Sequence, residues 1–397
     1  MPIATEPRIL ILSGAVPQTW YAGSLLLYRL LQHHPSALLK AVGPRPQPSS
    51  DTLACEYAEL LPAPSSRLDL TRLAEFKRSL QAMSLVGRIP DSRVDQAVGR
   101  FQPDVVVTVM ERFDYVDAAH RFCRRHGLPL AVMVHDRLES FERVYPAFAP
   151  AQQRRFADVY QDAAVRFCIS PEMEQCLQMA YGAAGTVLYP NRAEELTPRP
   201  VEASSLLAAP PGLTIGYAGA MNYGYGERIA QVMPRLAAAG ITLRVYSREA
   251  PPEMKGVVYA GAFRRTIDLW EQVKKECDVV WLPYSYSAEL RSLYETHFPS
   301  KLTEYLALGM PVLITGPSYA TGVRWGLRHP DAAAVVTDEQ PEQILDALER
   351  LRESAPWRLQ LASEARSAGD ADFEPARIRA IFLEALATAS RSVPVAS

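Results

Sequence analysis

Three polar residues between positions 296 and 315 have the types and spacing needed to bind a nucleotide. Ser300 and Lys301 lie four and three positions before Glu304, so on a helix the three side chains share one stripe. Free N–H groups and the positive end of the helix dipole favour an anion near Ser300 and Lys301. Glu304 lies roughly 6 Å further along the axis, which is about the separation between a nucleotide's diphosphate and its ribose hydroxyls. One short helix is therefore predicted to contact both groups.

Signals for that helix flank the three residues. Pro299 suits the first helical position, and Gly309 followed by Pro311 is typical of a helix end. Leu302, Tyr305 and Leu306 recur at helical spacing and are predicted to face inward, before a buried strand at 312–315. The same pattern also fits a plain surface helix on which Lys301 and Glu304 form a weak exposed pair.

A resemblance to a known family favours the nucleotide site. The run Pro299-Ser-Lys-Leu-x-Glu304-Tyr-Leu-Ala-x-Gly309-x-Pro311-Val resembles the donor-binding signature of nucleotide-sugar glycosyltransferases with the two-Rossmann GT-B fold, and is most similar to glycosyltransferase family 4. The resemblance implies that Glu304 binds the donor ribose, and that Pro299, Ser300 and Lys301 bind the diphosphate. It departs at Thr296, where the family commonly has a second glutamate. His297 is the natural substitute, or an exposed loop histidine.

Other stretches resemble the same family and extend the similarity over residues 100–315. These are Cys168-Ile-Ser-Pro-Glu-Met, Tyr181-Gly182, Leu188-Tyr-Pro-Asn191 and Cys277-Asp-Val-Val-Trp-Leu-Pro283. The implied activity is a hexosyltransferase type of glycosyl transfer, with a nucleoside diphosphate sugar as co-substrate.

Alternation of apolar runs and amphipathic stretches predicts an α/β protein with two doubly wound, Rossmann-like domains, and the resemblance adds that they face a cleft. The 397 residues are too many for one ordinary core. We predict a first domain at 1–195, a linker at 196–212, a second domain at 213–372 and an amphipathic tail helix within 373–397. The resemblance implies that this helix packs back onto the first domain. Strands are expected at 8–12, 104–109, 130–134, 165–169, 186–188, 213–218, 241–246, 257–259, 278–282, 312–315 and 333–336.

The first domain is expected to supply acceptor and catalytic groups. His135 and Asp136 follow a buried strand, where ligand loops of open α/β sheets lie. The family often has a histidine here that contacts the sugar. Asp136 would serve as a general base if the reaction inverts configuration, would orient His135 if it retains configuration, or would simply cap a following helix. Tyr21 and Gly23 resemble the family's first loop, near the donor phosphates or acceptor, although a simple helix entry also explains Gly23.

Further donor contacts are expected after the first strands of the second domain. Gly219 and Asn222 belong to a glycine-rich strand-to-helix turn that could bring backbone N–H groups to phosphate, or could be a plain turn. Arg248 ends the next strand and is either a phosphate or base contact or a surface arginine. Phe263 lies where the family's backbone meets the base edge, or belongs to the core.

The composition limits the partners. A net charge of −2 gives no reason to expect nucleic acid, and five scattered cysteines fit a reducing cytoplasm. No cofactor and no metal are expected, because Asp370-Ala-Asp372 is assigned to a loop beside the tail helix. The sequence shows no signal peptide or membrane span. The basic, aromatic run 112–126 could contact anionic lipid at the inner membrane face, but a solvated helix face is favoured.

These observations favour a cytoplasmic glycosyltransferase that acts on a glycan, lipid-linked or small-molecule acceptor, in bacterial polysaccharide, glycolipid or glycoconjugate synthesis. Two alternatives stay open. One is a nucleotide-sugar 2-epimerase, which shares the architecture. The other is a catalytically silent nucleotide-sugar-binding protein, which the absence of a glutamate at Thr296 allows.

Overall fold

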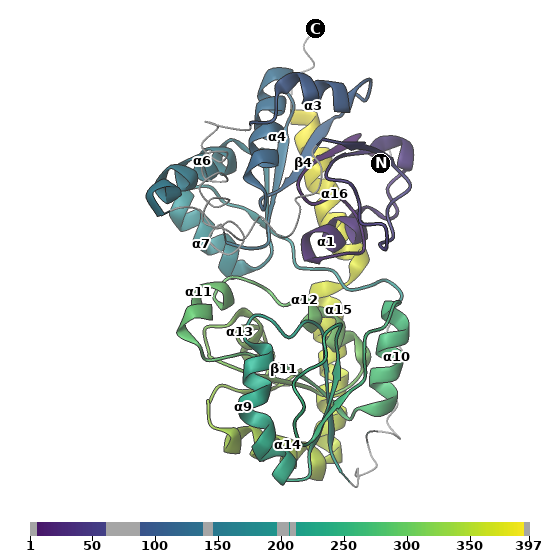
Figure 1. The fold of residues 1–397 in the computed structure, drawn as a ribbon, viewed down its shortest axis with the longest axis vertical. Coiled ribbons are helices and arrows are strands. Elements are labelled where there is room, and N and C mark those ends of the chain that lie inside the picture. Colours follow the sequence, from purple (N-terminus) through teal and green to yellow (C-terminus); the bar gives the residue numbers. More distant parts are fainter. Residues whose placement is uncertain (1–5, 61–87, 138–145, 197–205, 207–211, 393–397) are drawn as a thin grey trace. The chain divides into compact units, whose positions relative to one another are not determined.

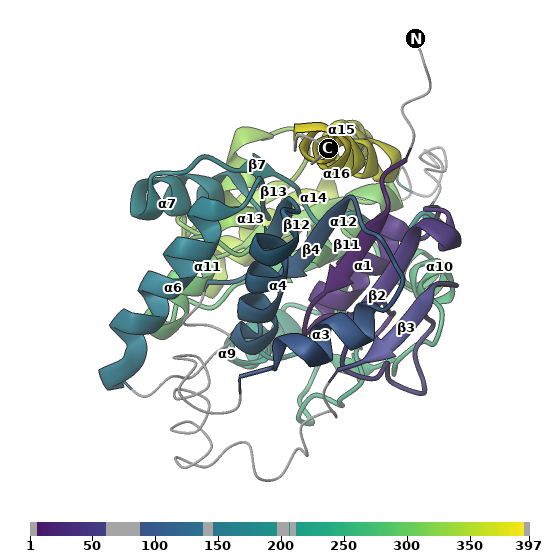
Figure 2. The ribbon, with the colours of Figure 1, turned by 90° about the horizontal axis from the view of Figure 1, so that it is seen from above.

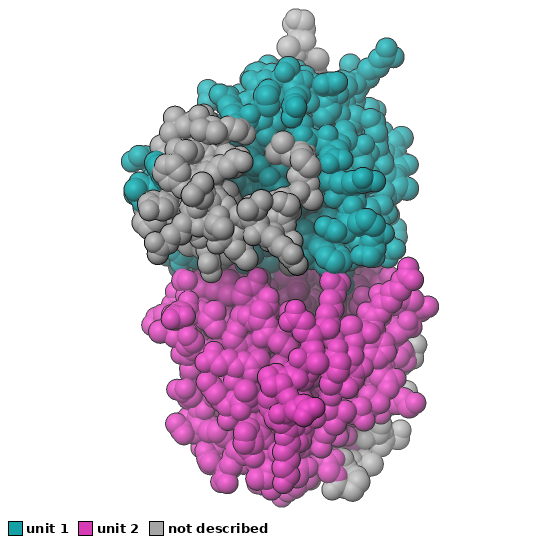
Figure 3. All heavy atoms as spheres, viewed as in Figure 1, with its two compact units in different colours: residues 1–189, 376–397 teal, residues 190–375 magenta. Residues whose placement is uncertain are grey.

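The chain divides into two units (Figure 3). Each unit is α/β and contains its own parallel sheet. A computed structural model describes residues 6–60, 88–137, 146–196, 206 and 212–392. Unit 1 comprises residues 1–189 and 376–397, and unit 2 comprises residues 190–375. The α/β fold class with two doubly wound sheets is thereby confirmed.

Unit 1 contains a seven-stranded sheet whose strands are all parallel, in the order β3-β2-β1-β4-β5-β6-β7. The chain starts in the middle, winds outward to one edge and then returns to fill the other side. This order places a topological switch point between β1 and β4, where open α/β sheets bind ligands. The strands are β1 (Ile9–Leu12), β2 (Leu39–Gly43), β3 (Glu56–Glu59), β4 (Val105–Val109), β5 (Leu130–Val134), β6 (Val165–Cys168) and β7 (Thr186–Val187).

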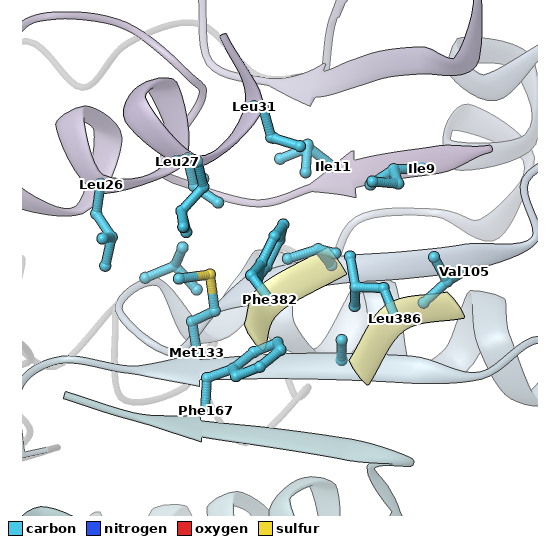
Figure 4. Packing of buried hydrophobic residues seen from close by; sticks show 14 of the residues in the cluster. Ile9, Ile11, Leu26, Leu27, Leu31, Val105, Met133, Phe167, Phe382 and Leu386 are labelled. Carbon is cyan, nitrogen blue, oxygen red and sulfur yellow. The ribbon is translucent and has the colours of Figure 1, made fainter. Parts of the chain in front are cut away.

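Helices cover this sheet, and the last helix of the chain is one of them (Figure 1). They are α1 (Ala22–Leu31), α3 (Asp91–Val98), α4 (Phe113–His126), α6 (Ala149–Asp162), α7 (Pro171–Tyr181) and α16 (Pro375–Ser392), with short 3-10 turns at Ser36–Leu38 and Pro146–Phe148. Ile378, Phe382 and Leu386 of α16 are buried in the same cluster as Ile11 and other strand residues (Figure 4). The Phe382 ring lies 5.2 Å from that of Phe167. The tail helix is therefore part of the unit 1 core.

The basic residues of α4 are used within unit 1. Helices α3 and α4 pack side by side (Figure 2). Arg121 binds Asp117 one turn earlier and also Asp91 of α3, while Arg125 donates to both oxygens of Asp95. These pairs connect two helices, so the positive charge that suggested a lipid contact is locally balanced. None of the helices in the described part of the chain has the length and apolar character needed to span a bilayer.

Unit 2 repeats the same winding in a six-stranded parallel sheet of order β10-β9-β8-β11-β12-β13. Its switch point lies between β8 and β11. The strands are β8 (Thr214–Ala218), β9 (Thr242–Tyr246), β10 (Val257–Tyr259), β11 (Val279–Pro283), β12 (Val312–Thr315) and β13 (Ala334–Val336). The helices are α9 (Tyr225–Ala238), α10 (Thr266–Glu276), α11 (Arg291–Tyr294), α12 (Ser300–Tyr305), α13 (Thr321–Arg328), α14 (Pro341–Glu353) and α15 (Ala355–Phe373), with 3-10 turns at Ala288–Leu290 and Leu306–Leu308.

The boundaries of unit 2 differ from those predicted. It begins at Pro190 because Arg192, which is only 1% exposed, forms a 2.5 Å ion pair with Asp370 of α15. It extends to Pro375 because α15 runs to Phe373, whose ring packs 5.4 Å from Phe298. The predicted linker 196–212 lies outside the described residues, apart from positions 196, 206 and 212.

Candidate functional site

A cluster of polar side chains lies at the carboxyl ends of β4 and β5 in unit 1. Glu111 follows β4, and its Oε1 accepts a 2.5 Å hydrogen bond from Tyr21. His135 follows β5, and its Nε2 lies 3.8 Å from Glu111 Oε2 and 3.5 Å from Asp136 Oδ2. Gly23 keeps this approach open, because a Cβ there would lie 3.0 Å from His135 Cε1 and 3.1 Å from Glu111 Oε2. The structure therefore brings together four predicted residues, Tyr21, Gly23, His135 and Asp136, around a carboxylate.

Burial controls the protonation of this cluster. Removal from water raises the pKa of Glu111, although His135 and the hydrogen bond from Tyr21 act in the opposite direction. The pKa of the Tyr21 phenol is also raised, first by burial and then by the Glu111 charge. A carboxyl group in this setting keeps its proton to a higher pH than an exposed one, and its ionised form is a stronger base for a bound hydroxyl. The helix that Asp136 was alternatively predicted to cap would lie within residues 138–145, which are outside the described part of the chain.

Helix α12 of unit 2 contains the predicted diphosphate and ribose contacts. It begins at Ser300, so Pro299 is the residue before the helix and not its first residue as predicted. The φ of +67° at Gly309 ends the following 3-10 turn in the left-handed conformation, as expected. Leu302 and Tyr305 are fully buried, which confirms the inward face.

Lys301 and Glu304 point to different partners and do not form the exposed pair that was the alternative. Lys301 Nζ donates to the Tyr217 hydroxyl at 2.8 Å, and lies 3.7 Å from the centre of the Tyr225 ring. Glu304 Oε2 accepts a 3.0 Å hydrogen bond from the indole of Trp270. Burial lowers the pKa of Lys301 from 10.5 to about 7. Among the described residues, no carboxylate forms an ion pair with this ammonium group.

The glycine-rich turn after β8 approaches Lys301 but does not present the expected amide at Gly219. Gly219 has a φ of +133°, and its N–H donates to the carbonyl of Tyr246 at 2.9 Å, so that N–H is already used. A Cβ at Gly219 would lie 3.2 Å from Lys301 Nζ, so the glycine gives the ammonium room. Asn222 is exposed in the same turn, and Tyr223 beside it has a positive φ of 55°, a strained conformation that often marks functional loops.

The remaining predicted donor contacts lie on the same unit. Arg248 is exposed directly after β9. Phe263 is 36% exposed, so it is not a core residue, and its ring lies 6.1 Å from that of Tyr246. The backbone of His297 is held by a 2.8 Å hydrogen bond to Leu293 and by the Thr321 hydroxyl, and the residue is partly exposed.

The Asp370-Ala-Asp372 pair forms part of α15 and not of a loop, which corrects the prediction. Asp370 pairs with Arg192, and Asp372 accepts a 2.8 Å hydrogen bond from the Trp325 indole. Both carboxylates thus stabilise the fold of unit 2. Across the described residues, no group of three or more His, Cys, Asp and Glu side chains is arranged to hold a metal ion.

Three residues of these clusters were missed from the sequence. Glu111 directly follows the apolar strand at 104–109, and that position at a strand end was the available signal. Tyr217 and Tyr225 flank the glycine-rich turn, but nothing in their spacing shows that a lysine more than seventy positions later would reach them.

Comparisons with known proteins agree with this architecture. No protein-family model matches the chain, and no curated protein sequence matches it. The chain is similar to Anabaena HepE, solved in complex with UDP and glucose, at a TM-score of 0.62 and 15% identity over 96% of this chain and 100% of HepE. It is also similar to sucrose-phosphate synthase from Thermosynechococcus elongatus, at a TM-score of 0.66 and 12% identity over 96% and 98% of the two chains.

A third solved structure extends the comparison to lipopolysaccharide synthesis. WaaG, a glycosyltransferase involved in lipopolysaccharide biosynthesis, is similar at a TM-score of 0.54 and 14% identity, over 94% of this chain and 98% of WaaG. The similarity covers nearly the whole length in each comparison. The chain therefore has the GT-B fold that these solved glycosyltransferases share.

Proposed function

We propose that this protein is a glycosyltransferase of the hexosyltransferase type, which moves a sugar from a nucleoside diphosphate sugar to an acceptor hydroxyl. The observation that carries the proposal is the ammonium group of Lys301, beside Gly219 at the carboxyl end of β8. It is largely buried, and no described carboxylate neutralises it. Such a cation at a switch point suits the diphosphate of a donor.

Glu304 completes the donor site in this proposal. Trp270 holds one carboxylate oxygen through a 3.0 Å hydrogen bond, which limits how the side chain can rotate. Carboxylate oxygens accept several hydrogen bonds, so Glu304 can also accept from ribose hydroxyls. Pro299, Ser300 and His297 surround the same helix start, while Asn222, Arg248 and Phe263 are assigned to the sugar, phosphate and base. The complexes of HepE with UDP and with UDP-glucose support this type of donor.

The acceptor and catalytic groups are assigned to unit 1. His135 contacts the transferred sugar, and Glu111 or Asp136 accepts the proton of the acceptor hydroxyl if the reaction inverts configuration. With retention, the leaving phosphate takes that proton, and the carboxylates orient His135. Tyr21 and Gly23 shape the same site. The proposed acceptors are glycans or lipid-linked or small-molecule hydroxyls in bacterial glycan synthesis, reached in the cytoplasm or by peripheral contact with the inner membrane face.

We propose further that the reaction needs no metal cofactor, because Lys301 supplies positive charge to the leaving diphosphate. Chelation should then leave the rate unchanged. A rate that falls with EDTA and returns with Mg²⁺ or Mn²⁺ would refute this part.

A panel of nucleotide sugars tests the proposal. The full chain is incubated with UDP-glucose, GDP-mannose, ADP-glucose and dTDP-glucose, and release of nucleoside diphosphate is measured as slow hydrolysis of the donor. Glu304→Ala and Lys301→Ala should each weaken donor binding at least about tenfold, the usual cost of losing a hydrogen bond to a charged group. Lys275→Ala, on the exposed surface of α10, is the matched control and should bind like the parent.

Three outcomes separate this function from its alternatives. Interconversion of sugar epimers without nucleotide release would show an isomerase. A rise in melting temperature with no turnover, even with acceptors added, would show a silent binding protein. If Glu304→Ala and Lys301→Ala bind every nucleotide sugar as well as the parent does, the assignment of the donor site is wrong.

A further inference from the structure

The ammonium of Lys301 is held by the side chains of Tyr217 and Tyr225, which we call the tyrosine niche, and Tyr305 is bonded to the strand end beside them. Nζ is 3.7 Å from the centre of the Tyr225 ring and 4.6 Å from that of Tyr217. Both distances fall within the range at which a ring face attracts a cation. The niche therefore stabilises the charged lysine without providing a negative charge.

Hydrogen bonds fix the direction in which the niche presents this group. The Tyr217 hydroxyl donates its proton to the carbonyl of Ala220, so the oxygen turns its lone pairs to Lys301. The Tyr305 hydroxyl accepts from the N–H of Ala218 at 2.9 Å and lies 3.3 Å from the carbonyl of the same residue, which holds the end of β8 against α12. The lysine is thus positioned by contacts with both β8 and α9.

The ammonium keeps donors for a ligand. A lysine has three N–H donors, and Tyr217 accepts from one of them. Gly219 itself places no side chain against this group, since a Cβ at that position would lie 3.2 Å from both Nζ and Cε. The residue as a whole is partly exposed.

We propose that Tyr217 and Tyr225 are positioning residues that hold Lys301 as the receptor for the donor's diphosphate, and that this lysine takes up a proton when the donor binds. The inference rests on the proposed function and assigns a proton-linked step to the same site. Removal from water disfavours the charged form of Lys301, and no carboxylate among its described neighbours restores it. The diphosphate supplies the missing negative charge, so binding and protonation support each other.

The tyrosines around the lysine do not change their protonation state between pH 6 and pH 9. Burial raises the pKa of Tyr217, Tyr225 and Tyr305 above the usual value for tyrosine, so all three stay neutral. Tyr294, which also borders the cluster, has its pKa raised to about 12 for the same reason. The nearest acidic residue on α12 is Glu304, which binds Trp270. Among these groups, the protonation change between pH 6 and pH 9 therefore belongs to Lys301, and the loss of proton uptake in Lys301→Met distinguishes it from a histidine elsewhere in the proposed site.

The sign of the effect follows from linkage. The pKa of Lys301 is about 7 in the free protein, and a bound diphosphate raises it. Donor affinity is then greatest below pH 7 and falls by up to about tenfold for each pH unit above that value, until the raised pKa is reached. Nucleotide sugars are the right probes, because their diphosphate has no terminal group with a pKa of about 6, unlike a free nucleoside diphosphate.

The first experiment observes the lysine without any donor. The chain has only six lysines, so the side-chain carbons of ¹³C-labelled lysine can be followed individually by NMR as pH is varied. One signal should titrate near pH 7 and be missing in Lys301→Met. Tyr217→Phe, which keeps the ring but removes the acceptor, should lower the pKa further, and so should Tyr225→Leu. Tyr246→Phe removes a buried hydroxyl that bonds Glu276 instead, and should leave the signal unchanged.

The second experiment measures the proton. UDP-glucose, or whichever nucleotide sugar of the panel binds, is titrated calorimetrically at pH 8 in phosphate and in Tris, whose ionisation enthalpies differ. The heats should show net uptake of most of one proton per donor bound, and Lys301→Met should abolish it. Tyr217→Phe should weaken binding about tenfold with a steeper loss at high pH, whereas Tyr246→Phe should follow the parent.

These measurements distinguish an error in the inferred role of the tyrosine niche from an error in the proposed function. A Lys301 signal that titrates near pH 10, like an exposed lysine, overturns the inference whether or not a donor binds. A donor that binds without proton uptake also overturns it. If Lys301 titrates near pH 7 but no nucleotide sugar binds, the proposed function fails, and inorganic pyrophosphate tests the niche alone: a raised lysine pKa supports an anion receptor, and an unchanged one overturns it.

Discussion

Replacing Lys301 by methionine should make unit 2 more stable in acid and neutral solution. Methionine has a flexible unbranched side chain of similar length, and its sulfur packs favourably against aromatic rings such as those of Tyr217 and Tyr225. It carries no charge that must be removed from water. The substitution therefore eliminates the penalty of a buried ammonium while keeping the volume of the tyrosine niche filled.

The size of the gain follows from the pKa of the lysine. The interval between 10.5 and about 7 corresponds to at most roughly 4 to 5 kcal/mol of folding free energy. Because the residue is partly exposed and both rings attract the cation, we expect about 2 kcal/mol. The unfolded lysine binds a proton up to its ordinary pKa and the folded one only up to about pH 7. The penalty is therefore complete below pH 7 and disappears as pH rises toward 10.5.

Thermal unfolding at pH 6, 8 and 10 measures this effect. Relative to the parent at the same pH, Lys301→Met should raise the melting temperature of unit 2 by about 4 to 8 °C at pH 6, and the gain should shrink steadily to pH 10. Lys275→Met on the exposed side of α10 is the control and should change little at any pH. A variant that is less stable than the parent at pH 6, or whose gain does not depend on pH, would refute the reasoning.

Two further predictions concern unit 1. Glu111→Gln keeps an acceptor for the Tyr21 hydroxyl but removes a buried charge. Burial raises the pKa of this carboxyl group, so its penalty is absent below the ordinary carboxyl pKa, grows as pH rises from there to the raised pKa and is complete above it. The variant should therefore be more stable than the parent at pH 8 but not at pH 4, and donor turnover should fall at least about 100-fold. Unchanged turnover would remove Glu111 from the mechanism. Phe382→Ala should lower the free energy of unfolding of unit 1 by about 3 to 5 kcal/mol in urea, because the ring is fully buried against Phe167, and Ile381→Ala, at a partly buried position of the same helix, should cost less; equal losses would contradict the packing.

Local patterns were sufficient to predict most of the fold. Strand β5 begins and ends at the predicted residues, and β12 does too, because each is a clear apolar run between strong boundary signals. Strands β2 and β3 and helices α3 and α13 were not anticipated. Lys40 in β2 explains one failure: it is 3% exposed, and its ammonium is satisfied by Glu56 of the neighbouring strand and by the Val98 carbonyl. A buried charge with distant partners gives no local apolar signal.

The candidate site was predictable only in part. The types and helical spacing of Lys301 and Glu304 were visible locally, but their partners Tyr217 and Trp270 depend on how strands and helices are ordered in the sheet. Glu111 and His135 are likewise brought together by the pairing of β4 with β5. Gly219 was expected to offer its N–H to phosphate. In the structure that N–H donates to the Tyr246 carbonyl of the neighbouring strand, and the absence of a side chain makes room for Lys301.

The position of α16 has a consequence for how the protein is made. The segment 190–375 is synthesised in full before Phe382 and Leu386, which complete the core of the unit that comes first in the chain. Unit 1 therefore cannot finish its core before the whole sequence of unit 2 has been made, in contrast to domains that fold one after the other from the amino terminus. A premature stop codon that removes α16 would leave the sequence of unit 2 complete and the core of unit 1 unfinished.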